Sequence, residues 1–307
     1  MNKAMFLVIA LASILSLAAD AGEKSDLRIA ITFDDLPVHG DLPPGVTRQQ
    51  VGRDLIKALK AAHAPSVYGF VNAVHLQNDA ALGEVLSDWR AAGYPLGNHT
   101  WSHLNLNELS REAYTAEIVQ DEASLQQYSK GLDWRWFRYP FLSEGSTSEK
   151  RQAIREVLSQ RGYHVAAVTM SFSDYLWNDP YARCAARQDA AAIKLLEKNY
   201  LLAAAEALDH AHQMSVALYG RDIPYVLLMH VGAFDAHIMP QLLKLYRDHR
   251  VKLISLPQAE QDSYYASDVN AALPAQPPSL EARMVARGLA VPANDATLTV
   301  TLSNICK

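Results

Sequence analysis

Seven short apolar runs alternate with stretches of helical periodicity, and this alternation limits the possible folds more than any other feature. The runs are rich in β-branched and aromatic residues, which favour strands. They are Arg28–Phe33, Val67–Val71, Tyr94–Asn98, Trp134–Arg138, His164–Thr169, Tyr225–Met229 and Val251–Leu256. The periodic stretches between them include Arg48–Ala62, Ala80–Ala92, Ser110–Gln127, Glu149–Gln160 and His237–Asp248. Strand–helix alternation predicts an α/β fold with a mostly parallel sheet.

Seven such repeats within ~230 residues fit a closed or nearly closed barrel better than an open sheet. We therefore predict a distorted (β/α)7-type barrel. Residues 181–219 interrupt the strand–helix alternation, because they form one long Ala- and Leu-rich segment with helical spacing. We interpret them as a helical insertion that either covers the core or borders a substrate groove. Beyond Leu256 the pattern weakens, and prolines interrupt any regular element. Residues 298–302 alternate like a final edge strand.

Residues 1–21 have the pattern of a signal peptide. Lys3 supplies a positive start, Met5–Ala18 is apolar, and Ala19-Asp20-Ala21 resembles a cleavage site. An uncleaved anchor is the alternative. The predicted organisation is a signal peptide at 1–21, a main domain at 22–257 that contains the 181–219 insertion, and a C-terminal extension at 258–307. The mature protein is expected in the periplasm or secreted, with no stable membrane span after cleavage.

Charge and cysteine content narrow the function and the compartment. The 307 residues carry a net charge of −5 with no long single-sign run, which indicates no nucleic-acid partner. The two cysteines, Cys184 and Cys306, fit an oxidising compartment. A disulfide between them would tie the C-terminal tail to the segment after Trp177, although the sequence leaves open whether the two thiols meet. It also leaves the oligomeric state open.

Polar side chains that can carry chemistry stand at the ends of the predicted strands. Asp34 and Asp35 close the first strand, and His99, Arg138 and His230 follow later ones. Successive strand side chains point to opposite sides, so the two carboxylates are expected to have different roles. One would bind a metal, and the other would transfer a proton. In parallel barrels the carboxyl ends of the strands meet at one rim, where the chemistry lies. A strand end with solvated carboxylates is the alternative.

The segment His99-Thr100-Trp101-Ser102-His103 supplies two imidazoles four residues apart. If the segment turns helical, both rings share a face and lie within reach of one ion. With a carboxylate from another strand end they form a three-ligand set that leaves a fourth position open, as in catalytic zinc sites. Water at such a site becomes acidic enough to attack a carbonyl near neutral pH. A structural histidine pair is the alternative.

These motifs resemble those of the polysaccharide deacetylase family, whose domain is called the NodB-homology domain or carbohydrate esterase family four. The motif T-F-D-D stands as Thr32–Asp35, and H-[ST]-x-x-H stands as His99–His103. R-x-P-[FY] stands as Arg138–Phe141, and Leu-x-His stands as Leu228–His230. The motifs follow the family order across about three quarters of the chain, between residues 28 and 257.

The resemblance implies a role for each matching residue. Asp35, His99 and His103 would bind one divalent metal, most often zinc in this family, with cobalt or nickel able to substitute. Asp34 would be the general base, and Arg138 would pair with it and hold it ionised. This set implies a metal-dependent hydrolase that acts on non-peptide carbon–nitrogen bonds.

The remaining roles belong to the later motifs. The backbone N–H of Tyr139 would stabilise the oxyanion, and His230 would protonate the leaving group. The sequence departs here from the family pattern D-x-x-D-W, because Ser171 stands at the position of the first Asp and Tyr175 at that of the Trp. Asp174 is retained as the partner of His230. The departures put the substrate subsite in doubt.

Aromatic residues near the motifs favour a sugar ligand, because the C–H faces of sugar rings pack on aromatic faces. The predicted substrate-binding residues are Trp101, Tyr139, Phe141 and Trp177. Trp134 and Trp136 are interpreted as core residues of a strand. His39 could lie at the rim of the site, but we expect a solvated loop residue there.

The sequence predicts an exported metal-dependent hydrolase that removes N-acetyl groups from amino-sugar polymers or oligomers, peptidoglycan or chitin-like. Its predicted partner is an acetylated glycan. One alternative is an O-acetyl esterase that acts on a polysaccharide such as acetylated xylan. Another is a carbohydrate-binding protein without catalytic activity.

Overall fold

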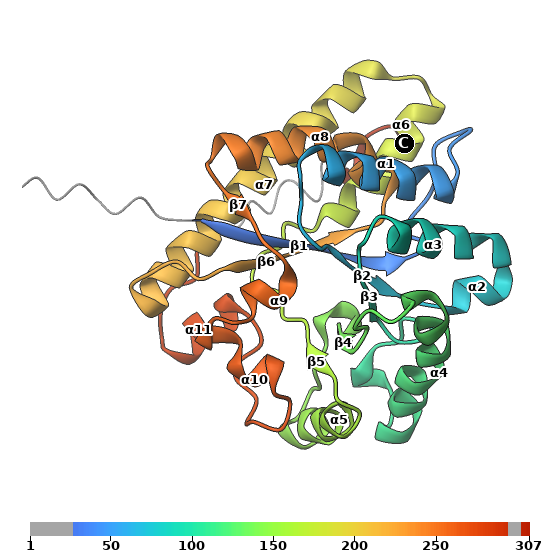
Figure 1. Cartoon of the computed structure of the whole chain (residues 1–307). Helices are drawn as coiled ribbons and strands as arrows, with labels where there is room; N and C mark the ends of the chain where they lie inside the picture. The colour runs from blue at the N-terminus through green and yellow to red at the C-terminus, as the bar shows by residue number, and fades with distance from the viewer. Residues whose placement is uncertain (1–26, 294–301) are drawn as a thin grey trace, which may run out of the picture.

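A curled sheet of parallel strands forms the centre of the computed structural model, which describes residues 27–293 and 302–307 (Figure 1). The strands are β1 (Arg28–Leu36), β2 (Tyr68–Val71), β3 (Leu96–Asn98), β4 (Trp136–Phe137), β5 (His164–Val165), β6 (Tyr225–His230) and β7 (Lys252–Leu253). Their order is β5-β4-β3-β2-β1-β6, and β7 pairs with the start of β1. All seven predicted strands are present. β4, β5 and β7 have only two residues each and are shorter than predicted, whereas β1 and β6 extend further and include Asp34, Asp35 and His230.

The segment after β5 joins the two edges of the sheet. β5 pairs with β4, but Met170, five residues further on, forms a parallel bridge with Leu227 of β6. The backbone N–H groups of Thr169 and Met170 donate to the Val226 carbonyl at 3.1 Å, and the Leu228 N–H donates to the Met170 carbonyl at 3.1 Å. This crossing curls the sheet into a distorted barrel, which confirms the predicted fold class.

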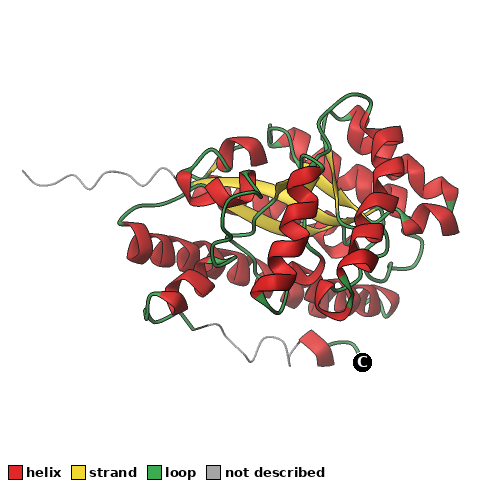
Figure 2. Ribbon diagram, turned by 90° about the horizontal axis from the view of Figure 1, so that it is seen from below, coloured by secondary structure: helices red, strands yellow, loops and turns green. Residues whose placement is uncertain are grey.

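Helices surround the strands, as Figure 2 shows from below. The α-helices are α1 (Arg48–Ala61), α2 (Val74–Asn78), α3 (Gly83–Ala91), α4 (Arg111–Ser129), α5 (Ser148–Gln160), α6 (Asn178–Ala186), α7 (Ala190–Tyr219), α8 (Ala233–Asp248), α9 (Leu256–Ala259), α10 (Ala266–Val269) and α11 (Leu280–Ala286). The 3-10 helices are η1 (Ala80–Leu82), η2 (Leu106–Glu108), η3 (Pro140–Leu142), η4 (Asp174–Trp177) and η5 (Ser263–Tyr265). Side chains of Thr47, Ser110 and Thr147 cap α1, α4 and α5, as their residue types favour.

The predicted insertion at 181–219 consists of two helices, α6 and α7, and begins at Asn178 rather than at residue 181. One face of the 30-residue α7 buries apolar residues such as Leu196 and Leu208, and the helix packs against α6, α8 and α11. Tyr200 of α7 donates a hydrogen bond to Asp235 of α8 at 2.7 Å. The insertion therefore covers part of the core. The proposed division into a main domain and an extension stays a prediction.

The carboxyl terminus is attached to α6. Cys184 and Cys306 form a disulfide with a Cα–Cα distance of 5.2 Å, which confirms the pairing that the sequence left open. The Arg183 side chain also donates to the Ile305 carbonyl at 3.1 Å. The predicted signal peptide lies outside the described residues, and so does the predicted edge strand at 298–302 except for Leu302, which is helical.

No helix in residues 27–293 or 302–307 combines the length and the apolar character that a bilayer crossing requires. The apolar side chains instead gather in one core between the sheet and the surrounding helices. Trp134 and Trp136 are buried there, as predicted.

Candidate active site

A cavity of about 400 Å³ opens at the carboxyl ends of the strands and brings the predicted chemical residues together. Asp34 and Asp35 reach it from β1, His99 and His103 from the loop after β3, and His230 from β6. The cavity is also lined by His39, Tyr139, Phe141, Leu142, Ser171, Ser173, Tyr175 and Leu228. The rim predicted from strand ends therefore exists, because parallel strands direct their carboxyl ends to one edge.

Asp35, His99 and His103 form a cluster that fits a divalent cation. Their ligand atoms lie within 4.8 Å of one another, and Nε2 of each imidazole is 3.5 Å from Asp35 Oδ1. That oxygen is buried and accepts no hydrogen bond from any described residue. His99 Nδ1 lies 2.8 Å from the Arg138 carbonyl and donates to it, so its Nε2 lone pair faces the carboxylate. Two imidazoles and a carboxylate are a ligand set typical of catalytic zinc.

The charge state of this cluster also suits a cation. Burial raises the pKa of Asp35, but hydrogen bonding to His39 and the proximity of His99 outweigh burial and hold it well below its usual value. Burial lowers the pKa of His103 to about 4. An ionised carboxylate and a neutral imidazole are the forms that bind metals.

The two imidazoles do not meet through a helical turn, so that prediction is wrong. The backbone leaves the helical region at Thr100 (φ 65°) and His103 (φ 57°), and residues 99–103 form an irregular turn. The rings of His99 and His103 nevertheless lie with their centroids 4.9 Å apart. Hydrogen bonds to neighbouring elements, rather than helical hydrogen bonds, stabilise this turn.

Two side chains each supply two of those hydrogen bonds. Asn72, just after β2, donates through its side-chain amide to the His99 and Thr100 carbonyls at 2.6 and 2.9 Å. Glu117 of α4 accepts from the backbone N–H and the hydroxyl of Ser102 at 2.7 and 2.8 Å. β2 and α4 therefore both position the His99–His103 segment.

Asp34 faces a fully buried arginine. Arg138 Nη1 lies 3.3 and 3.4 Å from the two carboxylate oxygens of Asp34. The same guanidinium donates to the Ala166 carbonyl at 2.7 Å and to the Thr32 hydroxyl at 3.1 Å, so its orientation is determined. Burial lowers the pKa of Arg138, and Asp34 offsets part of that effect. The pair gives Asp34 a defined position beside the cluster, with Oδ2 3.6 Å from His99 Nε2.

His230 is held by the buried Asp174. The His230 backbone N–H donates to one Asp174 oxygen at 2.6 Å, and Nδ1 donates to the other at 3.0 Å. Asp174 therefore engages Nδ1, and Nε2 is the ring nitrogen from which a proton could be delivered. Burial lowers the pKa of His230, but the Asp174 charge outweighs it and, with Asp35 and Asp34, raises the pKa to about 10. The imidazole is therefore protonated at neutral pH and can act as an acid.

His39 is a site residue that the sequence did not assign. We expected a solvated loop residue, but its side chain is only 17% exposed and Nδ1 lies 2.7 Å from Asp35 Oδ2. Its ring centroid is 4.7 Å from that of His230. Arg48 holds the His39 loop by donating to the backbone carbonyls of His39 and Gly40. The only sequence signal was its position four residues after Asp35, which does not reveal how the loop turns.

Of the predicted substrate-binding aromatics, only Tyr139 and Phe141 line the cavity. Phe141 is 63% exposed, and its ring lies 4.5 Å from that of His103. Tyr139 is buried beside it. A ligand can therefore contact the Phe141 face directly.

The two predicted tryptophans do not belong to this cavity. Trp177 is 0% exposed and packs against Tyr200 of α7, and Trp101 packs against the core without lining the cavity. Proximity to a motif in sequence does not set the direction of a side chain, so neither tryptophan reaches this cavity, and Trp177 instead lines a second cavity beside α7. Tyr175 instead supplies an aromatic ring to the cavity, with its centroid 5.3 Å from that of the His230 ring.

Comparisons with known proteins agree with the motifs. A family model described as polysaccharide deacetylase matches residues 21–178, which is just over half of the chain. A chitin deacetylase from Arthroderma benhamiae is 24% identical over 147 residues, which make up 48% of this chain and 35% of that protein. The chain therefore aligns with only about a third of that relative.

Solved structures show the same fold at low sequence identity. Chitin deacetylase from Colletotrichum lindemuthianum is 18% identical, with a TM-score of 0.53 over 76% of this chain and 88% of that chain. Peptidoglycan deacetylase PdaC from Bacillus subtilis is 18% identical, with a TM-score of 0.50 over 88% and 100%. A pseudoenzyme of carbohydrate esterase family 4 from Bacillus anthracis is 11% identical, with a TM-score of 0.53 over 76% and 65%.

The pseudoenzyme shows that this fold alone does not establish activity, so the function must be argued from the residues of the cavity. Membership of a family can be assigned without establishing activity. The matched model, the ordered motifs and the distorted barrel together show that this chain belongs to the polysaccharide deacetylase family.

Proposed function

We propose that this protein is an exported, metal-dependent deacetylase that hydrolyses N-acetyl groups of amino-sugar polymers or oligomers and releases acetate. One observation carries the proposal. A single cavity contains a cluster that could hold a cation, a carboxylate paired with a buried arginine, and an imidazole hydrogen-bonded to a buried carboxylate. Binding a sugar requires none of these three units, whereas metal-assisted hydrolysis of an amide uses a Lewis acid, a base and an acid, which these units can supply.

Asp35, His99 and His103 are the residues that would bind the ion. A divalent ion, zinc with cobalt or nickel as substitutes, would supply Lewis acidity at the acetyl carbonyl. Two features support this assignment: Asp35 Oδ1 accepts no hydrogen bond from the described residues, and Nε2 of His99 faces that oxygen.

The remaining residues would move the protons. The water oxygen bonds to the carbonyl carbon while Asp34 accepts a proton from that water. Arg138 keeps the Asp34 carboxylate in position. The carbon–nitrogen bond then breaks, and His230 delivers a proton to the nitrogen, which leaves as an amine beside acetate. The Tyr139 backbone N–H would donate to the developing oxyanion.

The His230–Asp174 pair favours amide over ester hydrolysis. An amine is a poor leaving group without a proton, whereas an alkoxide leaves more easily, so a well-supported acid is needed mainly for the amide. The two hydrogen bonds from His230 to Asp174 provide that support. An O-acetyl esterase is therefore the second candidate rather than the first.

Export is supported by the signal-like pattern of residues 1–21 and by the Cys184–Cys306 disulfide. Disulfides persist in the periplasm and outside the cell, where reducing systems of the cytosol do not reach.

Acetate release from matched N-acetyl and O-acetyl oligosaccharides tests the proposal directly. We expect release from the N-acetyl series, loss of that activity after chelation and recovery when zinc is added back. His103→Ala should lower metal content and activity together, whereas the exposed His249→Ala should change neither. Sugar binding without acetate release at any metal supplied would instead identify a carbohydrate-binding protein.

A further inference from the structure

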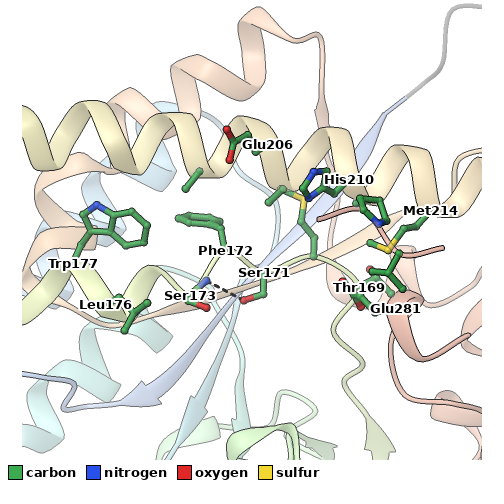
Figure 3. A pocket seen from close by; sticks show the side chains of 16 residues that line it. Thr169, Ser171, Phe172, Ser173, Leu176, Trp177, Glu206, His210, Met214 and Glu281 are labelled. Carbon is green, nitrogen blue, oxygen red and sulfur yellow. Dashed lines mark hydrogen bonds between the residues drawn. The ribbon is translucent and has the colours of Figure 1, made fainter. Parts of the chain in front are cut away.

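A second cavity, of about 260 Å³, adjoins the candidate active site, and Figure 3 shows the side chains that line this second cavity. Ser171 and Ser173 line both cavities, so the short segment after the β6 crossing is their common wall. The opposite wall is α7, the long helix of the insertion. The two cavities are therefore neighbours, and a chain-like ligand that occupied both would pass Ser171 and Ser173.

The lining of this second cavity suits a sugar ring. Ala203, Ala207 and Ala211 recur every four residues, so they share one face of α7 and leave space there. Phe172 and Met214 supply apolar surface on either side, as Figure 3 shows. Aromatic and aliphatic walls with a few polar groups are typical of small-ligand sites. The volume is below the roughly 300–1,000 Å³ of pockets for drug-sized ligands, which favours one ring rather than several.

The polar lining of this cavity includes two carboxylates and one imidazole beside the hydroxyls of Thr169, Ser171 and Ser173. Glu206 and His210 of α7 and Glu281 of α11 line it, and no lysine or arginine is among the described lining residues. No hydrogen bond or ion pair joins Glu206, His210 or Glu281 to another described residue, so all three are available to a ligand. Carboxylates accept hydrogen bonds from sugar hydroxyls and repel other carboxylates.

We propose that this cavity binds a second, uncharged sugar residue of the same glycan whose acetyl group occupies the active site. The inference rests on the proposed function and narrows its substrate class. A chitin-like oligomer of uncharged N-acetylated sugars fits both cavities, whereas a glycan that carries carboxylates on alternate sugars would place one beside Glu206 and Glu281. Specificity of this kind comes from repulsion of the wrong ligand as much as from attraction of the right one.

Filling the cavity tests whether an oligomer occupies it. Ala207→Trp should place a ring in the space, and Ala217→Trp, on an exposed position of the same helix, is the matched control. We expect Ala207→Trp to lower kcat/KM on a tetramer of N-acetylglucosamine on the order of 10-fold and to weaken its binding by calorimetry. Hydrolysis of a small acetyl ester, which needs only the first cavity, should not change. Unchanged tetramer binding and turnover would overturn the proposal.

Removing one charge tests the selectivity. Glu206→Gln should raise activity on a carboxylate-bearing oligomer relative to the neutral tetramer by several-fold, on the order expected for one like charge nearby. Asp209→Asn, exposed on α7 and outside the lining, should leave the ratio unchanged. An unchanged ratio in Glu206→Gln would contradict the charge argument, even if Ala207→Trp failed to fold.

The outcomes also separate this inference from the proposed function. Tetramer binding is measured without turnover, so its loss in Ala207→Trp would support the second cavity even if no acetate were released. Acetate release that is insensitive to both variants would support the function and reject the cavity.

Discussion

The two oxygens of the Asp35 carboxylate have different surroundings, and this division decides how the residue can bind an ion. Oδ2 accepts a hydrogen bond from His39, whereas Oδ1 has no partner among the described residues and faces His99 and His103. A ligand oxygen that is held by a neighbouring hydrogen bond keeps its direction when the ion binds. His39 is thus a positioning residue for Asp35.

Replacement of His39 should therefore weaken metal retention. His39→Ala leaves Asp35 Oδ2 without a donor, and we expect zinc affinity to fall by about 10–100-fold, the range typical of such supporting partners. Competition with a chromophoric chelator measures the affinity without any substrate. His39→Gln, which can still donate, should recover part of the loss, and His249→Ala should match the wild type. Equal affinities in all four proteins would remove His39 from this role.

The Asp174 charge should set the alkaline limit of activity. Asp174 raises the pKa of His230 against the lowering effect of burial, to about 10. An acid catalyst is lost as the pH rises through its pKa, so Asp174→Asn should move that loss to lower pH. We expect a displacement of at least about one pH unit, equivalent to 1.36 kcal/mol.

The measurement is kcat against pH over the neutral and alkaline range, with Asp209→Asn as the control. A variant that loses activity equally at every pH would show that Asp174 acts on folding or metal binding and not through the His230 proton.

At the scale of elements, short loops are shaped by neighbours distant in sequence. The His99–His103 turn follows the three-residue strand β3 and contains no helical hydrogen bonds. Its shape comes from Asn72 after β2 and from Glu117 on α4. The helix α4 thus contributes to the candidate metal site without supplying a ligand.

Glu117→Ala should disturb the site through this contact. The backbone N–H and hydroxyl of Ser102 lose their acceptor, at a cost on the order of 1 kcal/mol in the free energy of unfolding. Because His103 directly follows Ser102, zinc affinity should also fall, by several-fold. Chemical denaturation and chelator competition measure the two effects. Gln120→Ala, exposed on the same helix, is the control, and unchanged zinc affinity in Glu117→Ala would separate α4 from the site.

At the scale of the whole molecule, a disulfide connects segments 122 residues apart. It attaches the carboxyl terminus to α6, which packs against α7 and α8. A crosslink that closes so long a loop restricts the unfolded chain strongly.

Reduction should therefore lower the thermal stability. We expect a loss of about 2–4 kcal/mol in the free energy of unfolding and a lower Tm. The Cys184→Ser, Cys306→Ser double variant should start at the lower Tm and show no response to reductant, since the chain has no other cysteine. Thiol titration of the unfolded, unreduced wild type should find no free thiol. A Tm that reductant leaves unchanged in the wild type would contradict the expected contribution.

The sequence by itself determined the order of strands and helices and the residues at the strand ends, because local periodicity and residue type act over a few positions. The strand-end positions of Asp34, Asp35, His99, His103 and His230 therefore follow from the sequence alone. Only the tertiary structure decided the contacts across the rim of the strand ends, such as His39 with Asp35. It also decided that Tyr175 lines the candidate active site and that Trp177 lines the second cavity instead.

The physical reason is that these contacts depend on how the barrel closes. Met170 crosses to β6, and the segment after this crossing faces α7, so the walls of the second cavity come from segments with no local signal for meeting. Local sequence preferences select an element, but long-range packing selects the direction in which each of its side chains points.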